Sequence, residues 1–593
     1  MTIAKHDALR PLHALVKDVK ISLFGIDHAR LDSDMACLTK RLMTRGLTII
    51  MDDLPKLGKV YDKALSSEFF DLSLVPHSLR IKGGDFLFSS LVYRSFRRTG
   101  VIIDPDPLDI LFARSVFYLY KKVEEETSDE NKRLAIAEFY AIDEGLPTPS
   151  RIWSSEDFLK EGVNHHAFAD DDHLPCRKIL RQILDRICWE ITSNGEIHWD
   201  DFRPKHGPGA VSDLRRGMDK YSFPSWPRAL STIFPSEGWA SHLHDNAEDA
   251  LPETWGETSR NVVSKLICVP KTLSKPRVIA SEPTAHQYVQ QAVMQAIRQN
   301  MTSLARLMVD FNSQEKSREM CLQASLDGRN ATIDLSAASD RLSCYVVERA
   351  IKNPYLLRGL VATRTKFVVS ELKPEPQELR KFAPMGSAVT FPVQSLFYAA
   401  AALAAVVFER HGSRSLLWLS QYNFAKLQSY AKEIRIFGDD IIIPKDAVPF
   451  LVEILESYDL KINRDKSHTN GFFRESCGMD AYGGVDVTPL YLSTTSYGRL
   501  SSLDSWVAVR NNAYTKGFWS LSKFMDDSIP SSILRQVPTS HKAQGCVRLF
   551  TFLRQDTPHL YLKTRLNGDW QTLESKVFKI RVSRQVERRN DRK

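Results

Sequence analysis

Residues 434–443 constrain the fold of this chain more than any other segment. They read Ile-Arg-Ile-Phe-Gly-Asp-Asp-Ile-Ile-Ile, so a Gly-Asp-Asp tripeptide separates two apolar, β-prone runs. Glycine at the first central position suits a type II′ hairpin turn, which places the turn at Gly438 and Asp439. Pro444 ends the return strand, because proline cannot donate to a strand ladder. The pattern predicts a buried hairpin with Asp439 and Asp440 at its tip.

The flanking residues alternate between strand and helix patterns. A short strand is predicted at 331–334, and helices are predicted at 339–352, 391–408 and 448–458. The second of these helices is very apolar and is therefore expected to be buried; its longest apolar run, 396–408, is too short to cross a bilayer. The mixed order predicts an α+β fold in which helices pack on one face of an antiparallel sheet.

The charge of the chain is unevenly distributed. Its formal value is +8, a mild basic bias that is compatible with a polyanionic partner but does not establish one. Residues 576–593 alone hold eight Lys or Arg and two acidic residues. This segment is either a solvated tail or an arm that contacts phosphates, and in the second case binding weakens steeply with salt.

The cysteines and the N-terminal residues indicate a cytosolic setting. The eight cysteines are scattered and form no C-x-x-C pair, which argues against a zinc ribbon and suits a reducing compartment. Residues 1–24 mix charged and apolar side chains and lack the apolar block of a signal peptide. We expect no association with a membrane.

The Gly-Asp-Asp turn is the first candidate site. Two adjacent carboxylates repel each other, so one pKa should rise unless a cation lies between them. Oxygen-only ligands suit Mg²⁺, whereas the competing interpretation is an ordinary solvated turn. Asp334 favours the metal, because it closes an apolar strand and would add a third carboxylate to Asp439 and Asp440. Such a cluster can hold two Mg²⁺ about 3.5–4 Å apart for an in-line phosphoryl transfer.

Two polar segments lie between Asp334 and the hairpin. Asp340 stands at the start of the predicted helix 339–352, where a carboxylate also complements the helix dipole. Gly386 permits close backbone approach or an unusual φ. Thr390 offers a hydroxyl near a helix N-terminus. Taken alone, the segment around Gly386 and Thr390 would be an ordinary loop with a helix cap.

The basic candidates lie on both sides of these carboxylates. Strand alternation would place Lys275 and Arg277 on one face, with Lys271 nearby, in a geometry that can grip a triphosphate. The competing interpretation is a basic surface strand. Lys466 follows the predicted helix 448–458 and can protonate a leaving pyrophosphate. Without its context it would be a solvated lysine.

A metal-dependent hydrolase is a competing interpretation based on another segment. Its residues would be His165, His166, Asp170, Asp171, Asp172 and His173. An acid-rich loop explains this segment better. The chain contains neither a Walker A loop nor a G-x-G-x-x-G fingerprint.

In this order the candidate residues resemble the motif series of viral RNA-dependent RNA polymerases. The basic strand resembles motif F, and the others resemble motif A (Asp334, Asp340), motif B (Gly386, Thr390), motif C (Phe437–Asp440) and motif D (Lys466). A narrower resemblance, to the replicase β subunit of Qbeta-type positive-strand RNA bacteriophages, runs from about Lys205 to Tyr491. It rests on Asp334–Asp340, Met385-Gly386, Phe473–Gly478, Gly484–Pro489, His206–Ala210 and Lys271 to Pro283.

The resemblance implies a right-hand fold of fingers, palm and thumb. Its expected ranges are 1–325 for the N-terminal region and fingers, including the NTP-binding strand 262–283, 326–490 for the palm with motifs A to E, and 491–593 for the thumb and basic C-terminal segment. It implies two Mg²⁺ ions, for which Mn²⁺ can substitute, held by Asp334, Asp439 and Asp440. It also implies that Asp340 selects the ribose 2′-hydroxyl, because deoxyribose offers no such donor, and that Phe473–Gly478 lies where palm meets thumb.

The implied activity is RNA-directed RNA polymerisation that replicates a positive-strand RNA phage genome and releases pyrophosphate. The implied partners are a single-stranded RNA template, the nascent RNA, NTPs, the host elongation factors Tu and Ts and a host ribosomal protein, in the cytoplasm of the bacterial host. Phe437 departs from the usual tyrosine of these phage enzymes, and Ser387 and Gln394 depart from the usual motif B residues.

Two other functions remain as alternatives. A reverse transcriptase typically carries a bulky aromatic residue after the motif A aspartate, where this chain has small residues and then Asp340. A non-catalytic polymerase-like RNA-binding protein would be expected to lack one of the metal carboxylates, yet Asp334, Asp439 and Asp440 are all present.

Overall fold

The computed structural model describes residues 7–123, 127–161, 175–214, 220, 223–240, 262–271, 275–421, 423–541, 546–552 and 563–578. Most of the basic segment 576–593 and the acidic and histidine-rich stretch 165–173 lie outside these ranges. The chain divides into two compact units: unit 1 is Met1–Tyr61, Phe69–Glu125 and Val487–Lys593, and unit 2 is Asp62–Glu68 and Glu126–Asp486. Unit 1 thus combines residues 1–61 and 69–125 with residues 487–593, while the expected ranges of fingers, palm and thumb stay predictions.

Unit 1 is mainly helical. Its helices are α1 (Arg10–Ser22), α2 (His28–Arg45), α3 (Leu54–Ser67, which runs into unit 2), α4 (Ser89–Val92), α5 (Pro107–Tyr118), α21 (Leu503–Thr515), α22 (Trp519–Ser528) and α23 (Ser531–Leu534), with the short strands β13 (Thr539–Ser540), β14 (Leu549–Phe550), β15 (Thr564–Asn567) and β16 (Thr572–Ser575). Helices from both ends of the sequence meet here. The buried Asp18 of α1 accepts the backbone N–H groups of Ser520 and Leu521, at 2.7 and 2.9 Å, in the first turn of α22.

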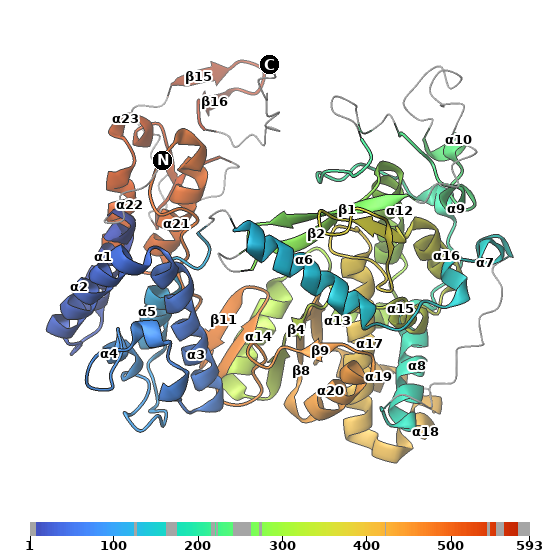
Figure 1. Ribbon diagram of the computed structural model, residues 1–593, viewed down its shortest axis with the longest axis horizontal. Coiled ribbons are helices and arrows are strands. Elements are labelled where there is room, and N and C mark those ends of the chain that lie inside the picture. The colour runs from blue at the N-terminus through green and yellow to red at the C-terminus, as the bar shows by residue number, and fades with distance from the viewer. Residues whose placement is uncertain are drawn as a thin grey trace. The chain divides into compact units, whose positions relative to one another are not determined.

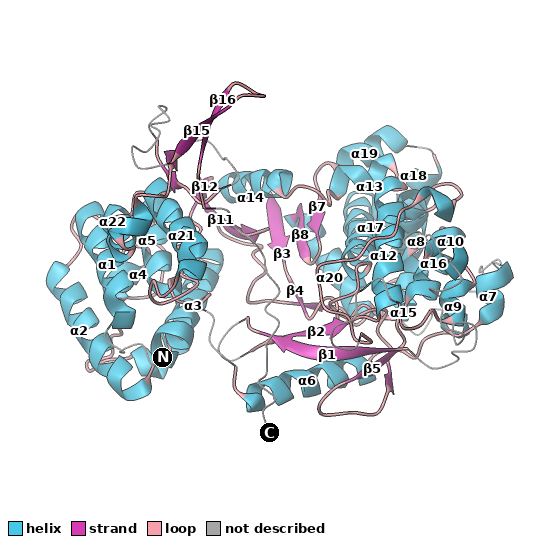
Figure 2. Ribbon diagram, turned by 90° about the horizontal axis from the view of Figure 1, so that it is seen from above, coloured by secondary structure: helices cyan, strands magenta, loops and turns pink. Residues whose placement is uncertain are grey.

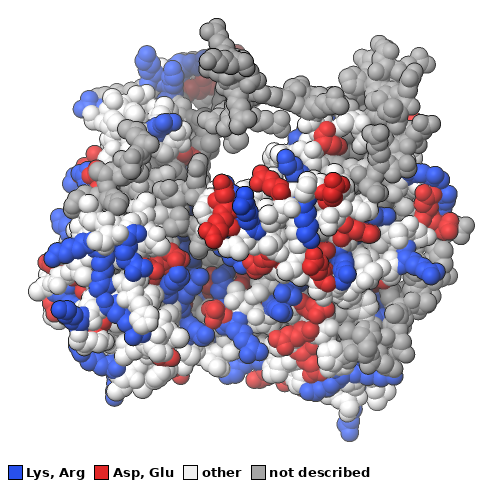
Figure 3. Space-filling view, in the orientation of Figure 1, with Lys and Arg blue, Asp and Glu red and all other residues white. Residues whose placement is uncertain are grey.

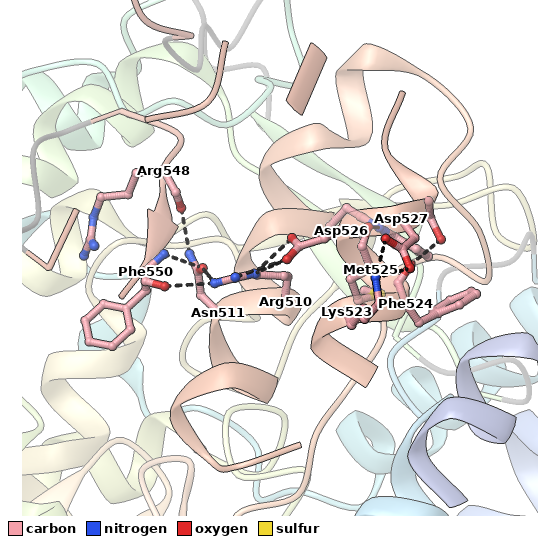
Figure 4. A network of polar contacts seen from close by, with 11 residues as sticks. Arg510, Asn511, Lys523, Phe524, Met525, Asp526, Asp527, Arg548 and Phe550 are labelled. Atoms are coloured by element: carbon pink, nitrogen blue, oxygen red, sulfur yellow. Dashed lines mark hydrogen bonds and ion pairs between the residues drawn. The ribbon is translucent and has the colours of Figure 1, made fainter. Parts of the chain in front are cut away.

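The C-terminal part of unit 1 is held by a polar network (Figure 4). Arg510 of α21 binds both carboxylate oxygens of Asp526 on α22, with Nε 3.0 Å from Oδ1 and Nη2 3.1 Å from Oδ2. It also donates to the carbonyl of Phe550 in β14 across 2.9 Å. Asn511 completes the connection, because its amide oxygen accepts the Phe550 N–H and its amide nitrogen donates to the Arg548 carbonyl.

Unit 2 contains helices and several small sheets (Figure 1). The helices are α6 (Asp129–Glu144), α7 (Glu156–Glu161), α8 (Lys178–Thr192), α9 (Arg228–Ser231), α10 (Ser236–Trp239), α12 (Thr284–Gln299), α13 (Ser303–Met308), α14 (Glu315–Asp327), α15 (Cys344–Ala350), α16 (Pro354–Thr363), α17 (Thr390–His411), α18 (Ser415–Ser420), α19 (Phe424–Ala431) and α20 (Val448–Ser457). On the face that carries α6, Lys and Arg side chains are mixed with Asp and Glu (Figure 3).

The strands of unit 2 form antiparallel and mixed sheets. A mixed sheet has the order β2 (Arg277–Ser281), β1 (Val263–Val269), β5 (Phe367–Val369) and β6 (Gln377–Glu378), with β1 and β5 parallel. The antiparallel sheets are β3 (Asn330–Ile333), β8 (Asp440–Pro444) and β7 (Arg435–Phe437); β10 (Phe473–Ser476), β11 (Met479–Tyr482) and β12 (Val485–Asp486); and β4 (Leu335–Ser336) with β9 (Lys461–Ile462).

The central sheet β3–β8–β7 is covered on both faces, not on one as expected. Ile441 and Ile443 belong to the large core around α17, whereas Ile442 packs with Cys321 of α14 and Ala481 of β11. Figure 2 shows the sheet between these helices. The physical reason lies in the sequence. A continuous apolar run buries both faces of a strand, whereas alternating apolar and polar residues bury only one face.

Helix α17 confirms the expectation of a buried helix. The segment 390–420 has the length and composition of a membrane span, yet 94% of its apolar window is buried within the protein. The hairpin and the helix at 448–457 are also confirmed. The helix predicted at 339–352 begins only at Cys344, because the Ser343 hydroxyl accepts the Val346 N–H and caps the helix there. Asp340 therefore lies in the preceding turn.

Candidate active site

The hairpin tip and the end of β3 bring three carboxylates to one end of the central sheet. Ile333 of β3 pairs with Ile441 of β8, so the next residue, Asp334, lies opposite Asp440 in the antiparallel register. Phe437 pairs with Asp440 across the turn. The strand end and the hairpin therefore place Asp334 beside Asp439 and Asp440, as the sequence predicted.

The turn itself is fixed against α17. Gly438 has a φ of 64° and Asp439 does not have positive φ, the combination of a type II′ turn. The Gly438 N–H donates to Oγ of Ser395, 3.1 Å away on α17. A Cβ on Gly438 would lie 2.9 Å from the ring of Phe391, so glycine also provides the space for this close packing. Helix α17 thus fixes where the two turn carboxylates stand.

Asp440 is a half-buried carboxylate that accepts a hydrogen bond from the backbone. The backbone N–H of Cys477, in the β10–β11 turn, donates to its Oδ2 across 3.1 Å. Burial raises the pKa of Asp440 to about 7, with the negative charges of Asp439 and Asp334 adding to the effect. The Cys477 N–H opposes this rise because it stabilises the ionised form.

Asp334 is held by residues that follow α20. The side-chain amide of Asn463 donates to its Oδ2 across 2.8 Å, and Nζ of Lys466 lies 3.7 Å from the same oxygen. Burial raises the pKa of Asp334, and the Lys466 ammonium works against that rise. Burial alone would lower the pKa of Lys466, but the carboxylates of Asp334 and Glu475 outweigh it and raise the pKa.

The basic candidates have two different surroundings: Lys271 is near the carboxylates, whereas Lys275 pairs with α6. Burial lowers the pKa of Lys271, as do its cationic neighbours Arg277 and Lys466, whereas Asp439 and Asp334 oppose the shift, so Lys271 lies within electrostatic range of the carboxylates. Arg277 begins β2. Lys275 precedes that strand and its Nζ lies 2.8 Å from Oε2 of Glu138 on α6. The expected alternation of Lys275 and Arg277 on one strand face is therefore wrong, because only Arg277 belongs to the strand.

The Gly386 loop packs edge-on against β2. The Ala280 N–H donates to the Met385 carbonyl across 2.7 Å, and Gly386 adopts a φ of 126°. A Cβ on Gly386 would lie 1.9 Å from the Ala280 carbonyl oxygen. Both expected properties of this glycine, close approach and unusual φ, are confirmed. Thr390 is the first residue of α17, and its hydroxyl bonds inward to the Pro384 carbonyl across 3.1 Å.

A buried polar chain links this loop to the end of β2. The Ala388 N–H donates to Oε1 of Gln290 across 3.2 Å, and Nε2 of Gln290 donates to Oε2 of Glu282 across 3.2 Å. Glu282 is 1% exposed, and burial raises its pKa to about 7. The hydroxyl of Thr365 also donates to Oε2 of this carboxyl.

Asp340 has a partner that the sequence did not indicate. Nζ of the buried Lys381 lies 3.1 Å from Oδ1 of Asp340. Lys381, Asn463, Cys477 and Ser395 each hold a candidate residue, yet sequence reasoning gave none of them that role. Cys477 does lie within Phe473–Gly478, a segment that carried the resemblance, and Asn463 lies three residues before Lys466; these were the available signals.

The carboxylates influence one another: besides burial, the charge of Asp439 raises the pKa of both Asp334 and Asp440. Among the described residues, no group of three or more His, Cys, Asp or Glu side chains is arranged to hold a metal ion by itself. A cavity of about 1160 Å³ lies elsewhere, lined by Asn330, Arg435 and Pro444 at the opposite end of the same three strands. The candidate site is therefore the strand end with Asp334, not this cavity.

Comparison with known proteins identifies the family. Residues 241–519 match the family model for the RNA replicase beta-chain. The RNA-directed RNA polymerase beta subunit of Enterobacteria phage SP is 31% identical over 449 residues, which cover 70% of this chain and 71% of that protein. The beta chain of Escherichia phage MS2 is 34% identical over 38% of this chain and 36% of its own length, and the beta subunit of Escherichia virus Qbeta is 30% identical over 49% and 42%.

These alignments differ in extent. With the beta chains of phages GA and MS2, this chain spans less than half of the relative's length, 46% and 36%. The alignment with the phage SP protein is broader, and residues 241–519, which match the family model, include the three carboxylates. The chain belongs to the RNA replicase beta-chain family.

Proposed function

We propose that this protein is an RNA-directed RNA polymerase that replicates the genome of a positive-strand RNA phage. The observation that carries the proposal is the placement of Asp334, Asp439 and Asp440 at one end of the central sheet, within electrostatic range of Lys271 and Lys466. Its relatives from phages SP and Qbeta are named RNA-directed RNA polymerase subunits.

Three carboxylates suit Mg²⁺ at this site. Asp439 and Asp334 help raise the pKa of Asp440 to about 7, after burial, and a divalent cation would relieve this repulsion. Asp334, Asp439 and Asp440 would hold the ions, two Mg²⁺ or Mn²⁺ in its place. Bound there, the ions would polarise the reacting phosphate and stabilise charge on the attacking and leaving oxygens.

The side chains around the carboxylates have separate tasks. Lys271 and Arg277 bind the triphosphate, because cations at the edge of the site attract its negative charge. Lys466 holds a proton on Nζ at neutral pH, since its pKa is raised by Asp334 and Glu475 against the effect of burial, and donates it to the leaving pyrophosphate. Asp340 accepts the ribose 2′-hydroxyl. Gly386 lets the loop before α17 lie against β2, and Thr390 fixes the start of α17.

The wider proposal follows the family resemblance. Unit 2 would supply palm and fingers, and part of unit 1 would supply the thumb of a right-hand polymerase. The template and the nascent strand would be RNA, and the cytoplasm of the bacterial host would be the place of action. The host elongation factors Tu and Ts and a host ribosomal protein would complete the replicase.

Asp439→Asn tests the activity. We expect it to lower incorporation of NTPs on an RNA template by about 10²–10³-fold or more, because one of the carboxylates that would hold the Mg²⁺ ions is removed. Asp446→Asn is the matched control, since this exposed aspartate lies beyond the other end of β8. Full incorporation by the Asp439 variant, or equal losses in both variants, would contradict the proposal; incorporation of dNTPs in place of NTPs would favour a reverse transcriptase.

A further inference from the structure

Lys381 is a charged side chain buried without water access. The residue is 0% exposed, and its Nζ lies 3.1 Å from Oδ1 of Asp340. The same ammonium lies 3.4 Å from the Phe139 carbonyl oxygen and 3.3 Å from the centroid of the Phe139 ring. A buried ammonium is costly unless it is paired and hydrogen-bonded. Asp340 supplies the carboxylate of this pair, and α6 supplies the remaining contacts.

The backbone on both sides of Lys381 is fixed. Its own N–H lies 2.9 Å from Oδ1 of Asp143, and the N–H of Arg380 lies 3.0 Å from Oδ2 of the same carboxylate. The Phe382 N–H donates to the Leu342 carbonyl across 2.7 Å, which ties this segment to the turn that follows Asp340. Lys381 therefore has little freedom to move relative to Asp340.

Asp340 is held on one side and accessible on the other. Its side chain is 23% exposed. Within the described parts of the chain, Lys381 is the one donor that reaches its carboxylate, and it uses Oδ1. Oδ2 is left to accept a hydrogen bond from outside the protein. A carboxylate with one oxygen anchored and the other available can accept a hydrogen bond from a single hydroxyl group in a defined orientation.

We propose that Lys381 is a positioning residue that orients Asp340 toward the ribose 2′-hydroxyl and thereby sets the preference for NTP over dNTP. The inference rests on the proposed polymerase activity and on the proposed role of Asp340. An anchored carboxylate meets the hydroxyl without first losing rotamer freedom, whereas an unanchored one rotates away or binds water. The discrimination between NTP and dNTP should therefore depend on Lys381, although Lys381 does not contact the nucleotide.

A second lysine–aspartate pair provides the matched control. Nζ of Lys352 lies 2.9 Å from Oδ1 of Asp185, and the Lys352 side chain is 10% exposed. The pair joins α8 to the segment that follows α15. Lys352→Met thus removes a similarly buried ammonium and its ion pair from unit 2 without touching Asp340.

The experiment compares Lys381→Met with Lys352→Met in the full chain, assembled as the active replicase. The measured quantity is the ratio of kcat/KM for an NTP to kcat/KM for its dNTP. We expect this ratio to fall about tenfold in Lys381→Met, the scale of one charge-assisted hydrogen bond lost from the transition state, and to stay unchanged in Lys352→Met. An unchanged ratio in an active Lys381→Met protein would overturn the inference. Failure of the unsubstituted protein to incorporate any NTP would instead contradict the proposed function.

A double variant keeps the test valid if Lys381→Met does not fold. Asp340→Asn and Lys381→Met together leave no unpaired charge, so the double variant should be tolerated better than removal of one partner. If Lys381 acts only through Asp340, the double variant and Asp340→Asn alone have the same NTP to dNTP ratio. A further loss of discrimination in the double variant would overturn the inference.

Discussion

The backbone N–H of Cys477 donates to Oδ2 of Asp440 across 3.1 Å. This bond connects the β10–β11 turn to the β7–β8 hairpin, and it depends on the backbone conformation of Cys477. That residue has a φ of 51°, in the left-handed region that few side chains adopt readily. The turn therefore stores strain next to the site that it supports.

Cys477→Val should weaken this support. A β-branched side chain tolerates positive φ poorly, so we expect a loss of about 1–2 kcal/mol in the free energy of unfolding relative to Cys477→Ser. Serine is the control because it is close in size and unbranched at Cβ. Chemical denaturation measures the difference, and NTP incorporation should fall with it in the valine variant. Equal stability of the two variants would show that the turn is not strained.

Glu282 should make stability depend on pH. Burial raises its pKa to about 7 in the folded protein, whereas the usual value for glutamate is about 4.3. The folded state therefore binds a proton that the unfolded state releases, so this contribution is present below about pH 4 and is lost as pH rises to about 7. The loss is on the order of 3 kcal/mol. Urea unfolding at pH 5 and pH 8 measures it.

Glu282→Gln provides the comparison for that pH dependence. Glutamine keeps an acceptor for Gln290 and Thr365 but has no proton to lose. We expect the variant to lose less stability than the unsubstituted protein between pH 5 and pH 8. The same pH slope in both proteins would assign the dependence to other groups.

Gly386→Ala should disrupt the loop before α17. The new Cβ would lie 1.9 Å from the Ala280 carbonyl oxygen, so the loop or β2 has to move. We expect a loss of about 3 kcal/mol in stability, together with most of the incorporation activity. Gly412→Ala is the control, because Gly412 also has positive φ but has no atom within 4 Å of the added Cβ; its cost should be about 1 kcal/mol. Thermal unfolding that ranks the two variants in the reverse order would contradict the clash.

Asp18→Ala should destabilise unit 1. The variant leaves the N–H groups of Ser520 and Leu521 without their acceptor at the start of α22, at a cost of about 1–2 kcal/mol. Asp104→Ala, at an exposed position of the same unit, should cost less than about 0.5 kcal/mol. Hydrogen exchange of the α22 amides would report the change locally. Unchanged exchange there would argue against the capping role of Asp18.

The carboxylate cluster was predictable because each of its parts has a recognisable pattern in the sequence. A hairpin fixes Asp439 and Asp440, and one antiparallel pairing to β3 brings Asp334 to them. The helix start at Cys344 was missed because the apolar periodicity continues on both sides of Ser343 and gives no sign of the cap there. Lys275 was misplaced because β2 begins two residues later than the alternation suggested.

The supporting contacts were not predictable because no motif in the sequence marks the residues that make them. Lys381 reaches Asp340 across 41 positions, and the Cys477 N–H reaches Asp440 across 37. No periodicity or propensity reports which backbone N–H will face a given carboxylate. The expectation of helices on one face failed for a different reason, since Ile442 is apolar on the face opposite Ile441 and Ile443 and is covered by α14 and β11.

The joining of α1 to α22 in unit 1 also sets an order of events during synthesis. About 500 residues separate Asp18 from Ser520, and ribosomes add roughly 5–20 residues per second, so α1 waits roughly 25–100 s for its partner. Unit 2 ends at Asp486 and can close before α22 emerges. The nascent chain thus completes its carboxylate-bearing unit first, while the apolar side of α1 remains a target for chaperones until α22 has been synthesised.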